Sequence, residues 1–222
     1  MAGKFFKSVI LGAPASGKGT ISSRIIKKFN LEHVSSGDLL RLNIKNGTAI
    51  GLEAKKYIQQ GKLVPDNLMI KFIVNEIKSL GAKSWLLDGF PRTLSQAQNF
   101  WEEEQIDVVL NLKVPFDVII ERVKGRWIHL PSGRVYNIDF NAPKIPGKDD
   151  VTGEDLVQRD DDKPEVVMER LKQYEALTKP VIEFYRKKGV LAEFEGKTSD
   201  EIWPQVLDCL VSYLPLHFTA RA

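Results

Sequence analysis

The chain has 222 residues, of which 43% are hydrophobic and 27% are charged. This length and balance predict one sizeable folded core with room for small inserts. A single cysteine, Cys209, excludes an internal disulfide and a cysteine-rich zinc cluster, and no apolar run approaches the ~20 residues of a membrane helix. The formal net charge of +3 gives no reason to expect nucleic acid as a partner.

The N-terminus is short and basic, and the first apolar stretch runs directly into a glycine-rich segment. We expect no secretory signal and no cleaved organelle presequence, because removal of about 20 residues would destroy that segment. The expectation is a cytosolic protein, or one imported without cleavage.

Short apolar runs alternate with segments of helical period along most of the chain. Strands are expected at 8–11, 33–34, 84–87, 107–112 and 190–194. Helices are expected at 19–29, 38–46, 51–60, 66–80, 95–104, 116–124, 164–179, 181–188 and from about 198 onward. Pro180 is expected to kink or break the long helix that starts at 164. The alternation predicts an α/β fold with a doubly wound parallel sheet.

Two excursions interrupt this rhythm. Residues 35–64 are helical and polar, whereas 125–162 show little helical period and are punctuated by proline and glycine. A small hairpin is expected at 127–136. The second excursion is too long for an ordinary loop, and we interpret it as a lid.

The segment Gly-Ala-Pro-Ala-Ser-Gly-Lys-Gly-Thr at 12–20 follows the first expected strand and precedes a helix. This order predicts a phosphate-binding loop, because backbone N–H groups and a helix N-terminus then surround an anion, with Lys18 as a point charge. Gly19 stands where Ser or Thr usually follows the lysine. That form is typical of small nucleotide kinases rather than of switch GTPases.

Asp88 ends an apolar strand and is followed by Gly-Phe-Pro-Arg92. A carboxylate in this place acts on Mg²⁺ through water in phosphate-loop enzymes; the alternative is a simple helix cap. Arg92 then lies at the carboxyl end of the strand, where α/β folds bind ligands.

Several arginines fall at the edges of the excursions or on helices beside them. They are Arg41, Arg122, Arg126, Arg159 and Arg170. Each alone is more often a solvated surface residue. Together, beside a phosphate loop, they predict a clamp for phosphoryl transfer between two nucleotides.

The acidic run at 160–162 is interpreted as a capped helix N-terminus, or alternatively as a charged hinge or a Mg²⁺–water contact. His129, Ser132, Asp149 and Thr152 have spacings that suit a four-ligand metal site. Because Ser and Thr are poor zinc ligands, a hydrogen-bonded polar knot is favoured and no zinc is expected.

These motifs together resemble the adenylate kinase family, in its long-lid form among the nucleoside monophosphate kinases. The resemblance covers nearly the whole chain. It rests on the glycine loop at 12–20, Ser-Ser-Gly-Asp-Leu-Leu-Arg at 35–41, Asp-Gly-Phe-Pro-Arg at 88–92, Ser-Gly-Arg-Val-Tyr at 132–136 and Asp-Asp-Val-Thr-Gly-Glu at 149–154. Within the family, Arg-Trp-Ile-His at 126–129, Tyr-Asn at 136–137 and the C-terminal segments resemble the mitochondrial GTP:AMP phosphotransferases.

The resemblance implies a P-loop core of residues 1–34, 65–124 and 163–222, a nucleoside-monophosphate-binding insert at 35–64 and a β-rich lid at 125–162. It implies reversible transfer from GTP (or ITP) to AMP, giving GDP and ADP, with ATP-dependent adenylate kinase as the alternative. Mg²⁺ would enter with the nucleotide, with no direct protein ligand and with Asp88 acting through water. A monomer in the mitochondrial matrix, with an uncleaved N-terminus, is expected, or alternatively one in the cytoplasm.

The resemblance also implies roles residue by residue. The catalytic residues would be Lys18, Arg92, Arg122, Arg126, Arg159 and Arg170. The donor triphosphate would be bound by Ala15, Gly17, Lys18, Gly19, Thr20, Arg126, Tyr136, Asn137 and Ser199. AMP would be bound by Ser36, Arg41, Lys62, Val64, Gly89, Arg92, Gln96, Arg159 and Arg170. Ala15 departs from the glycine common in the family and would cost about 1 kcal/mol if its φ is positive.

Two other classes of function predict features that the sequence lacks. A switch GTPase needs Ser or Thr directly after Lys18 and a guanine-reading Asn-Lys-x-Asp, and neither is present. A binding module with an inactive kinase fold would keep the glycines and lose the arginines, which are all retained.

Overall fold

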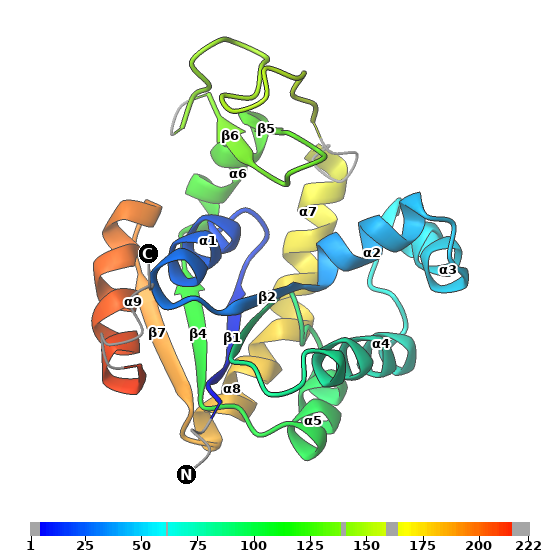
Figure 1. Cartoon of the computed structure of the whole chain (residues 1–222), viewed down its shortest axis with the longest axis vertical. Coiled ribbons are helices and arrows are strands. Elements are labelled where there is room, and N and C mark those ends of the chain that lie inside the picture. Colours follow the sequence, from blue (N-terminus) through cyan, green and yellow to red (C-terminus); the bar gives the residue numbers. More distant parts are fainter. Residues whose placement is uncertain (1–4, 61, 139–140, 159–163, 215–222) are drawn as a thin grey trace.

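The computed structural model describes residues 5–60, 62–138, 141–158 and 164–214. Its centre is a five-stranded parallel sheet in the order β2-β3-β1-β4-β7 (Figure 1). The strands are β1 (Lys7–Gly12), β2 (Glu32–Ser35), β3 (Trp85–Asp88), β4 (Val108–Lys113) and β7 (Leu191–Glu195). The predicted α/β fold is confirmed. The chain crosses to opposite sides of β1, so the switch point of the sheet lies at the carboxyl end of β1, next to the glycine loop.

Helices cover both faces of the sheet. They are α1 (Lys18–Phe29), α4 (Asp66–Ser79), α5 (Leu94–Glu103), α6 (Phe116–Lys124), α7 (Pro164–Gln173), α8 (Lys179–Lys187) and α9 (Ser199–Tyr213). Most of these bounds differ from the expected ones by one or two residues, because apolar period and capping residues mark them, whereas α7 ends at Gln173 instead of the expected residue 179. Thr93 and Thr198, for example, cap α5 and α9 through their side-chain oxygens.

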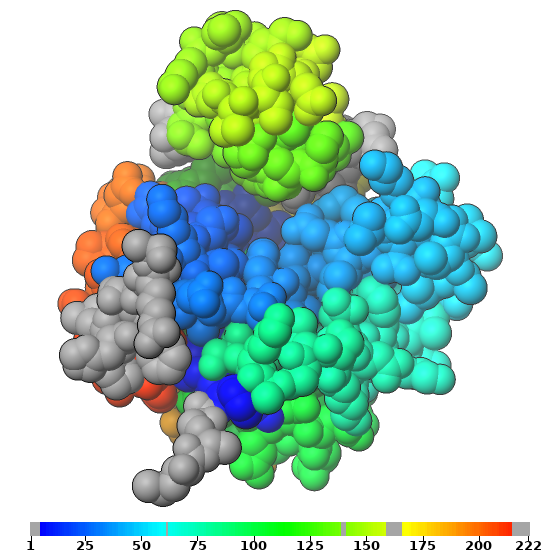
Figure 2. All heavy atoms as spheres, viewed as in Figure 1, coloured from blue at the N-terminus to red at the C-terminus, as the bar shows by residue number. Residues whose placement is uncertain are grey.

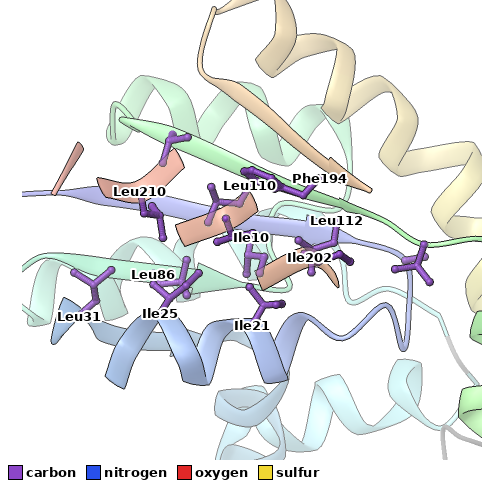
Figure 3. Packing of buried hydrophobic residues seen from close by; sticks show 14 of the residues in the cluster. Ile10, Ile21, Ile25, Leu31, Leu86, Leu110, Leu112, Phe194, Ile202 and Leu210 are labelled. Atoms are coloured by element: carbon purple, nitrogen blue, oxygen red, sulfur yellow. The ribbon is translucent and has the colours of Figure 1, made fainter. Parts of the chain in front are cut away.

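Alternating strand residues supply the two faces of the core. On one face, α1 and α9 pack on the sheet through the cluster drawn in Figure 3, which includes Ile10, Ile21, Ile25, Leu110 and Ile202. On the other face, α4, α5 and α8 pack on Val9, Leu87 and Val109. A sheet buried on both sides explains why its strands read as continuous apolar runs.

The sequence led us to expect a kink or a break at Pro180, and the structure shows no break in the helix there. A π-helical turn, η2 (Tyr174–Thr178), joins α7 to α8, and Pro180 lies in the first turn of α8. A proline inside a continuous helix removes one backbone donor and crowds the preceding turn. The wider turn before it lets the helix continue.

The two excursions form separate small units. The first excursion, which we call the insert, contains α2 (Ser36–Lys45) and α3 (Ala49–Ile58). The second, which we call the lid, contains the expected hairpin of β5 (Arg126–Ile128) and β6 (Val135–Asn137). Their expected bounds, 35–64 and 125–162, stay predictions. Figure 1 shows the insert beside α4 and the lid beyond α6. Figure 2 shows the lid as a distinct mass above the core. Among the described residues, no helix has the length and apolarity needed to cross a membrane.

Candidate active site

The glycine loop joins β1 to α1 and forms an open helix N-terminus. Gly17 caps α1 with φ 91°, and the first turn of α1 carries no acidic side chain. Lys18 Nζ donates to the carbonyl oxygens of Gly12 and Ala13, each at 2.8 Å. Gly19 and Thr20 are exposed in the first turn of the helix. Free backbone donors and the positive end of the helix dipole therefore face a common space, which suits an anion.

Positive charge converges on this loop from distant parts of the chain. Burial is the main cause that lowers the pKa of Lys18 to about 8, and Arg92, Arg170 and Arg126 lower it further, whereas Asp88 opposes the shift. A lysine held among like charges is unfavourable in the free protein. A polyanion bound at the loop would relieve that repulsion, which is the electrostatic pattern of a functional site.

A pocket that is open to solvent lies between the insert and the loop that follows β3. Its apolar wall includes Leu40, Ile58, Met69 and Phe90. All the described residues of the expected AMP set line it, namely Ser36, Arg41, Lys62, Val64, Gly89, Arg92, Gln96 and Arg170. A pocket lined by both apolar side chains and several cations suits a ligand with a flat base and a phosphate. Arg159, the remaining member, and the acidic run at 160–162 lie outside the described residues.

Gly89 lets the loop after β3 close on the insert. Its φ is 80°, and a Cβ there would lie 2.7 Å from Ser36 Oγ. Arg92 Nε donates to the Gly89 carbonyl at 2.7 Å, and Thr178 Oγ1 donates to the Arg92 carbonyl at 3.3 Å. Arg92 is thus fixed through its side chain by Gly89 and through its backbone by Thr178.

Arg122 is not among the residues that line this pocket. Its nearly buried guanidinium donates to the carbonyls of Ala15 at 3.3 Å and Lys197 at 2.5 Å, and burial lowers its pKa. Asn137 Nδ2 donates to the Arg122 carbonyl at 2.7 Å. Arg122 therefore ties the glycine loop to the segment before α9 and to the base of the lid. Its expected role in the phosphoryl clamp stays a prediction.

Two further donor-side residues lie close to the glycine loop. A Cβ at Gly17 would lie 2.7 Å from Ser199 Oγ, so Ser199 borders the loop. Its expected role in binding the donor nucleotide stays a prediction. Ala15 has φ 59°, so the condition for strain is met and its cost is about 1 kcal/mol. Arg126 begins β5 at the base of the lid.

The lid is held by a polar knot centred on Asp149. Its carboxylate accepts from Arg134 Nε at 2.8 Å and Nη2 at 2.6 Å, from Tyr136 Oη at 2.9 Å and from Thr152 Oγ1 at 3.0 Å. Arg134 is the main reason that the pKa of Asp149 lies well below its usual range. The hydroxyl of Tyr136, expected near the donor nucleotide, is thus used inside the lid.

His129 completes the knot. Its Nδ1 contacts Ser132 Oγ at 2.7 Å and its Nε2 contacts Glu154 Oε2 at 2.5 Å. A polar knot of His129, Ser132, Asp149 and Thr152 was expected from the sequence. The parts that Arg134 and Glu154 play in it were not expected. Their only signal was their place inside the two lid motifs at 132–136 and 149–154, because charged loop residues have no period that marks them as buried partners.

Comparison with known proteins agrees with this geometry. The model of the adenylate kinase family matches residues 10–190. The chain belongs to the adenylate kinase family. A relative from Drosophila melanogaster, named mitochondrial GTP:AMP phosphotransferase, is 56% identical over 203 residues, which cover 91% of this chain and 94% of the relative.

Two relatives from Saccharomyces cerevisiae bear the same name. One is 44% identical over 219 residues, covering 94% of each chain. The other is 44% identical over 210 residues, covering 90% of this chain and 93% of the relative. The aligned regions thus span nearly the full length of this chain and of each relative.

Proposed function

We propose that this adenylate kinase family member transfers the terminal phosphoryl group of GTP (or ITP) to AMP, giving GDP and ADP. The observation that carries the proposal is the cationic, half-apolar pocket that adjoins a phosphate-binding loop. The relatives named GTP:AMP phosphotransferase favour GTP over the alternative donor, ATP.

In the proposed reaction, a phosphate oxygen of AMP attacks the terminal phosphorus of the donor, and the bond to the departing GDP oxygen breaks. The AMP oxygen is already anionic, so no strong general base is required. Lys18 and the glycine-loop N–H groups hold the donor phosphates, while Arg92 and Arg170 hold the AMP phosphate and the charge that develops between the nucleotides. We assign Arg122, Arg126 and Arg159 to the same clamp, as the resemblance to the family implies.

Mg²⁺ is the metal implied by the family, and the residues present fit it. Asp88 ends β3 close enough to Lys18 to raise its pKa, and the Thr20 hydroxyl is exposed at the start of α1. Among the described residues, no three His, Cys, Asp or Glu side chains are grouped to hold a metal. One nearby carboxylate and open solvent suit Mg²⁺ that keeps its waters and rests on phosphates, where it would neutralise charge on the transferring group.

The remaining assignments extend the proposal to the whole chain. Residues 1–34, 65–124 and 163–222 form the core, 35–64 bind AMP, and 125–162 close over the donor as a lid without zinc. We assign the protein to mitochondria, as the names of the relatives suggest, and specifically to the matrix as a monomer.

The test is steady-state kcat/KM for GTP, ITP and ATP, each with saturating AMP and Mg²⁺. We expect GTP to be preferred over ATP, because a site whose buried groups match guanine leaves them unpaired with adenine. A clear preference for ATP would replace the proposal with ATP-dependent adenylate kinase.

A further inference from the structure

Gln96 is the one buried amide side chain that lines the pocket among the described residues. It is 2% exposed and lies in the first turns of α5. A primary amide has two N–H donors and two acceptor positions. Which way its oxygen points therefore decides what it offers to a ligand.

Two contacts fix that orientation. The backbone N–H of Arg92 donates to Gln96 Oε1 at 2.7 Å, and Gln96 Nε2 donates to Asp66 Oδ1 at 2.7 Å. An ionised carboxylate only accepts and a backbone N–H only donates. Reversing the amide would set oxygen against oxygen at Asp66 and N–H against N–H at Arg92, so both contacts enforce one orientation.

Asp66 is itself held in place behind the pocket wall. It is the first residue of α4, and its Oδ2 accepts from Thr93 Oγ1 at 2.7 Å. Thr93 caps α5 by accepting from the Gln96 backbone N–H at 3.2 Å. Asp66 is not among the residues that line the pocket. It reaches the ligand site only through Gln96.

We propose that Asp66 is a positioning residue that sets the base specificity of the acceptor site by locking the Gln96 amide. The inference rests on the proposed function, in which the acceptor is AMP. With one N–H and one oxygen lone pair used by Asp66 and Arg92, the amide presents one N–H and one lone pair to the pocket in a fixed order. Adenine offers the complementary pair, the N1 acceptor beside the N6–H donor. Hypoxanthine, the base of IMP, offers the reverse pair, an N1–H donor beside an O6 acceptor.

The experiment compares AMP and IMP as acceptors, with GTP as donor, in the wild type, Asp66→Ala and Asp66→Asn. The wild type should prefer AMP by about 100-fold or more in kcat/KM. Asp66→Ala removes the charged acceptor, so KM for AMP should rise about 10-fold with kcat little changed, and the AMP-to-IMP ratio should fall about 10-fold. Asp66→Asn should retain most of the preference, because its Oδ1 can still accept from Gln96 while its Nδ2 turns to the Thr93 hydroxyl.

Glu103→Gln is the matched control. Glu103 on α5 pairs with Lys78 on α4 at 2.9 Å, so it bridges the same two helices at an exposed position away from the pocket. Its kinetics should equal those of the wild type. Asp66→Leu, which keeps a side chain branched at Cγ but has no acceptor, replaces the alanine variant if thermal melting shows that the latter is poorly folded.

The outcomes separate the two proposals. A wild-type protein that does not phosphorylate AMP overturns the proposed function itself. An active wild type whose AMP-to-IMP ratio is unchanged by Asp66→Ala or Asp66→Leu leaves the function standing and overturns the role of Asp66. A general loss of kcat for both acceptors, with the ratio unchanged, also overturns it, because that is the pattern of a structural defect.

Discussion

The glycine loop and the lid use charge in opposite ways. At the loop, Lys18 is held among arginines, and its pKa is lowered by burial and by their repulsion. In the lid, Asp149 is paired with Arg134 and accepts several further hydrogen bonds, so its pKa is lowered by stabilisation of the charged form. At the glycine loop, a bound anion would offset the repulsion between the cations. In the lid, Arg134 already offsets the charge of Asp149. The comparison thus distinguishes a charged group that a bound ligand would stabilise from a charged group that stabilises the folded lid.

The sharpest test of this contrast is Lys18→Met. We expect turnover to fall by about 10²–10³, because a charge aligned with the transferring phosphates is lost. Stability should not fall, because the substitution also removes a lysine from among like charges. Steady-state kinetics and thermal melting check the two parts. Lys28→Met, at an exposed position in the last turn of the same helix, is the control and should change neither. Near-wild-type turnover of a folded Lys18→Met protein would refute the phosphate-loop assignment.

In the lid, the corresponding change is Asp149→Asn. It leaves Arg134 without its carboxylate and weakens the hydrogen bonds from Tyr136 and Thr152, so the lid should open more readily. Hydrogen exchange at lid amides should speed up by about 10-fold or more, with core amides unaffected. Asp155→Asn, which removes an exposed pairing with Lys148 in the same lid, should have little effect. Equal exchange in the two variants would contradict the central role of Asp149.

A smaller expected effect is the uptake of protons when the donor nucleotide binds. With a pKa of about 8 in the free protein, Lys18 is partly neutral at pH 8, and bound phosphates favour its charged form. Binding of the donor nucleotide at pH 8 should therefore take up about half a proton, as measured by calorimetry in buffers of different ionisation enthalpy. Lys18→Met should remove this uptake. Proton release, or uptake that persists in the variant, would mean that another group titrates.

The same lysine affects stability with a definite sign. Its pKa in the folded protein lies below the unfolded value of about 10.4, so the unfolded chain binds more protons between these values. The contribution of Lys18 thus makes the protein more stable as pH rises from about 8 towards 10. Asp149 behaves differently, since its stabilisation is present above about pH 4 and is lost as the medium becomes more acidic.

The smallest expected effect is that of Ala15→Gly. Glycine relieves the left-handed backbone strain at φ 59° but gives the unfolded chain more freedom, so stability should rise by less than about 1 kcal/mol. Denaturant unfolding measures it. A loss of stability would mean that the alanine methyl makes contacts that outweigh the strain.

Much of the architecture was predictable because local chemistry marks it. The strands are continuous apolar runs, and the capping residues Thr93 and Thr198 mark the starts of two helices. The glycine loop stands in the usual order of strand, loop and helix. The pocket residues also converge as the family motifs implied. These features depend on neighbours in sequence or on motifs matched residue by residue.

The rest depends on partners far apart in sequence. Asp66 reads as an ordinary helix start, yet its carboxylate binds residues 27 and 30 positions later. Arg122 looks like one more arginine beside an excursion, yet it joins loops 107 and 75 positions away. No local period or spacing reveals such contacts, because tertiary packing decides which polar groups meet.

The π-helical turn η2 determines how α7 and α8, the two halves of the long helix, are rotated relative to each other. Arg170, upstream of η2, lines the pocket, while Thr178, at the end of η2, donates to the backbone carbonyl of Arg92. A π turn inserts one residue into a helix, and one residue corresponds to about 100° of rotation around an α-helix. Deleting a single residue there would restore regular α geometry and turn Arg170 out of phase with Thr178. The irregular turn thus sets the rotational register in which Arg170 lines the pocket while Thr178 holds the backbone of Arg92.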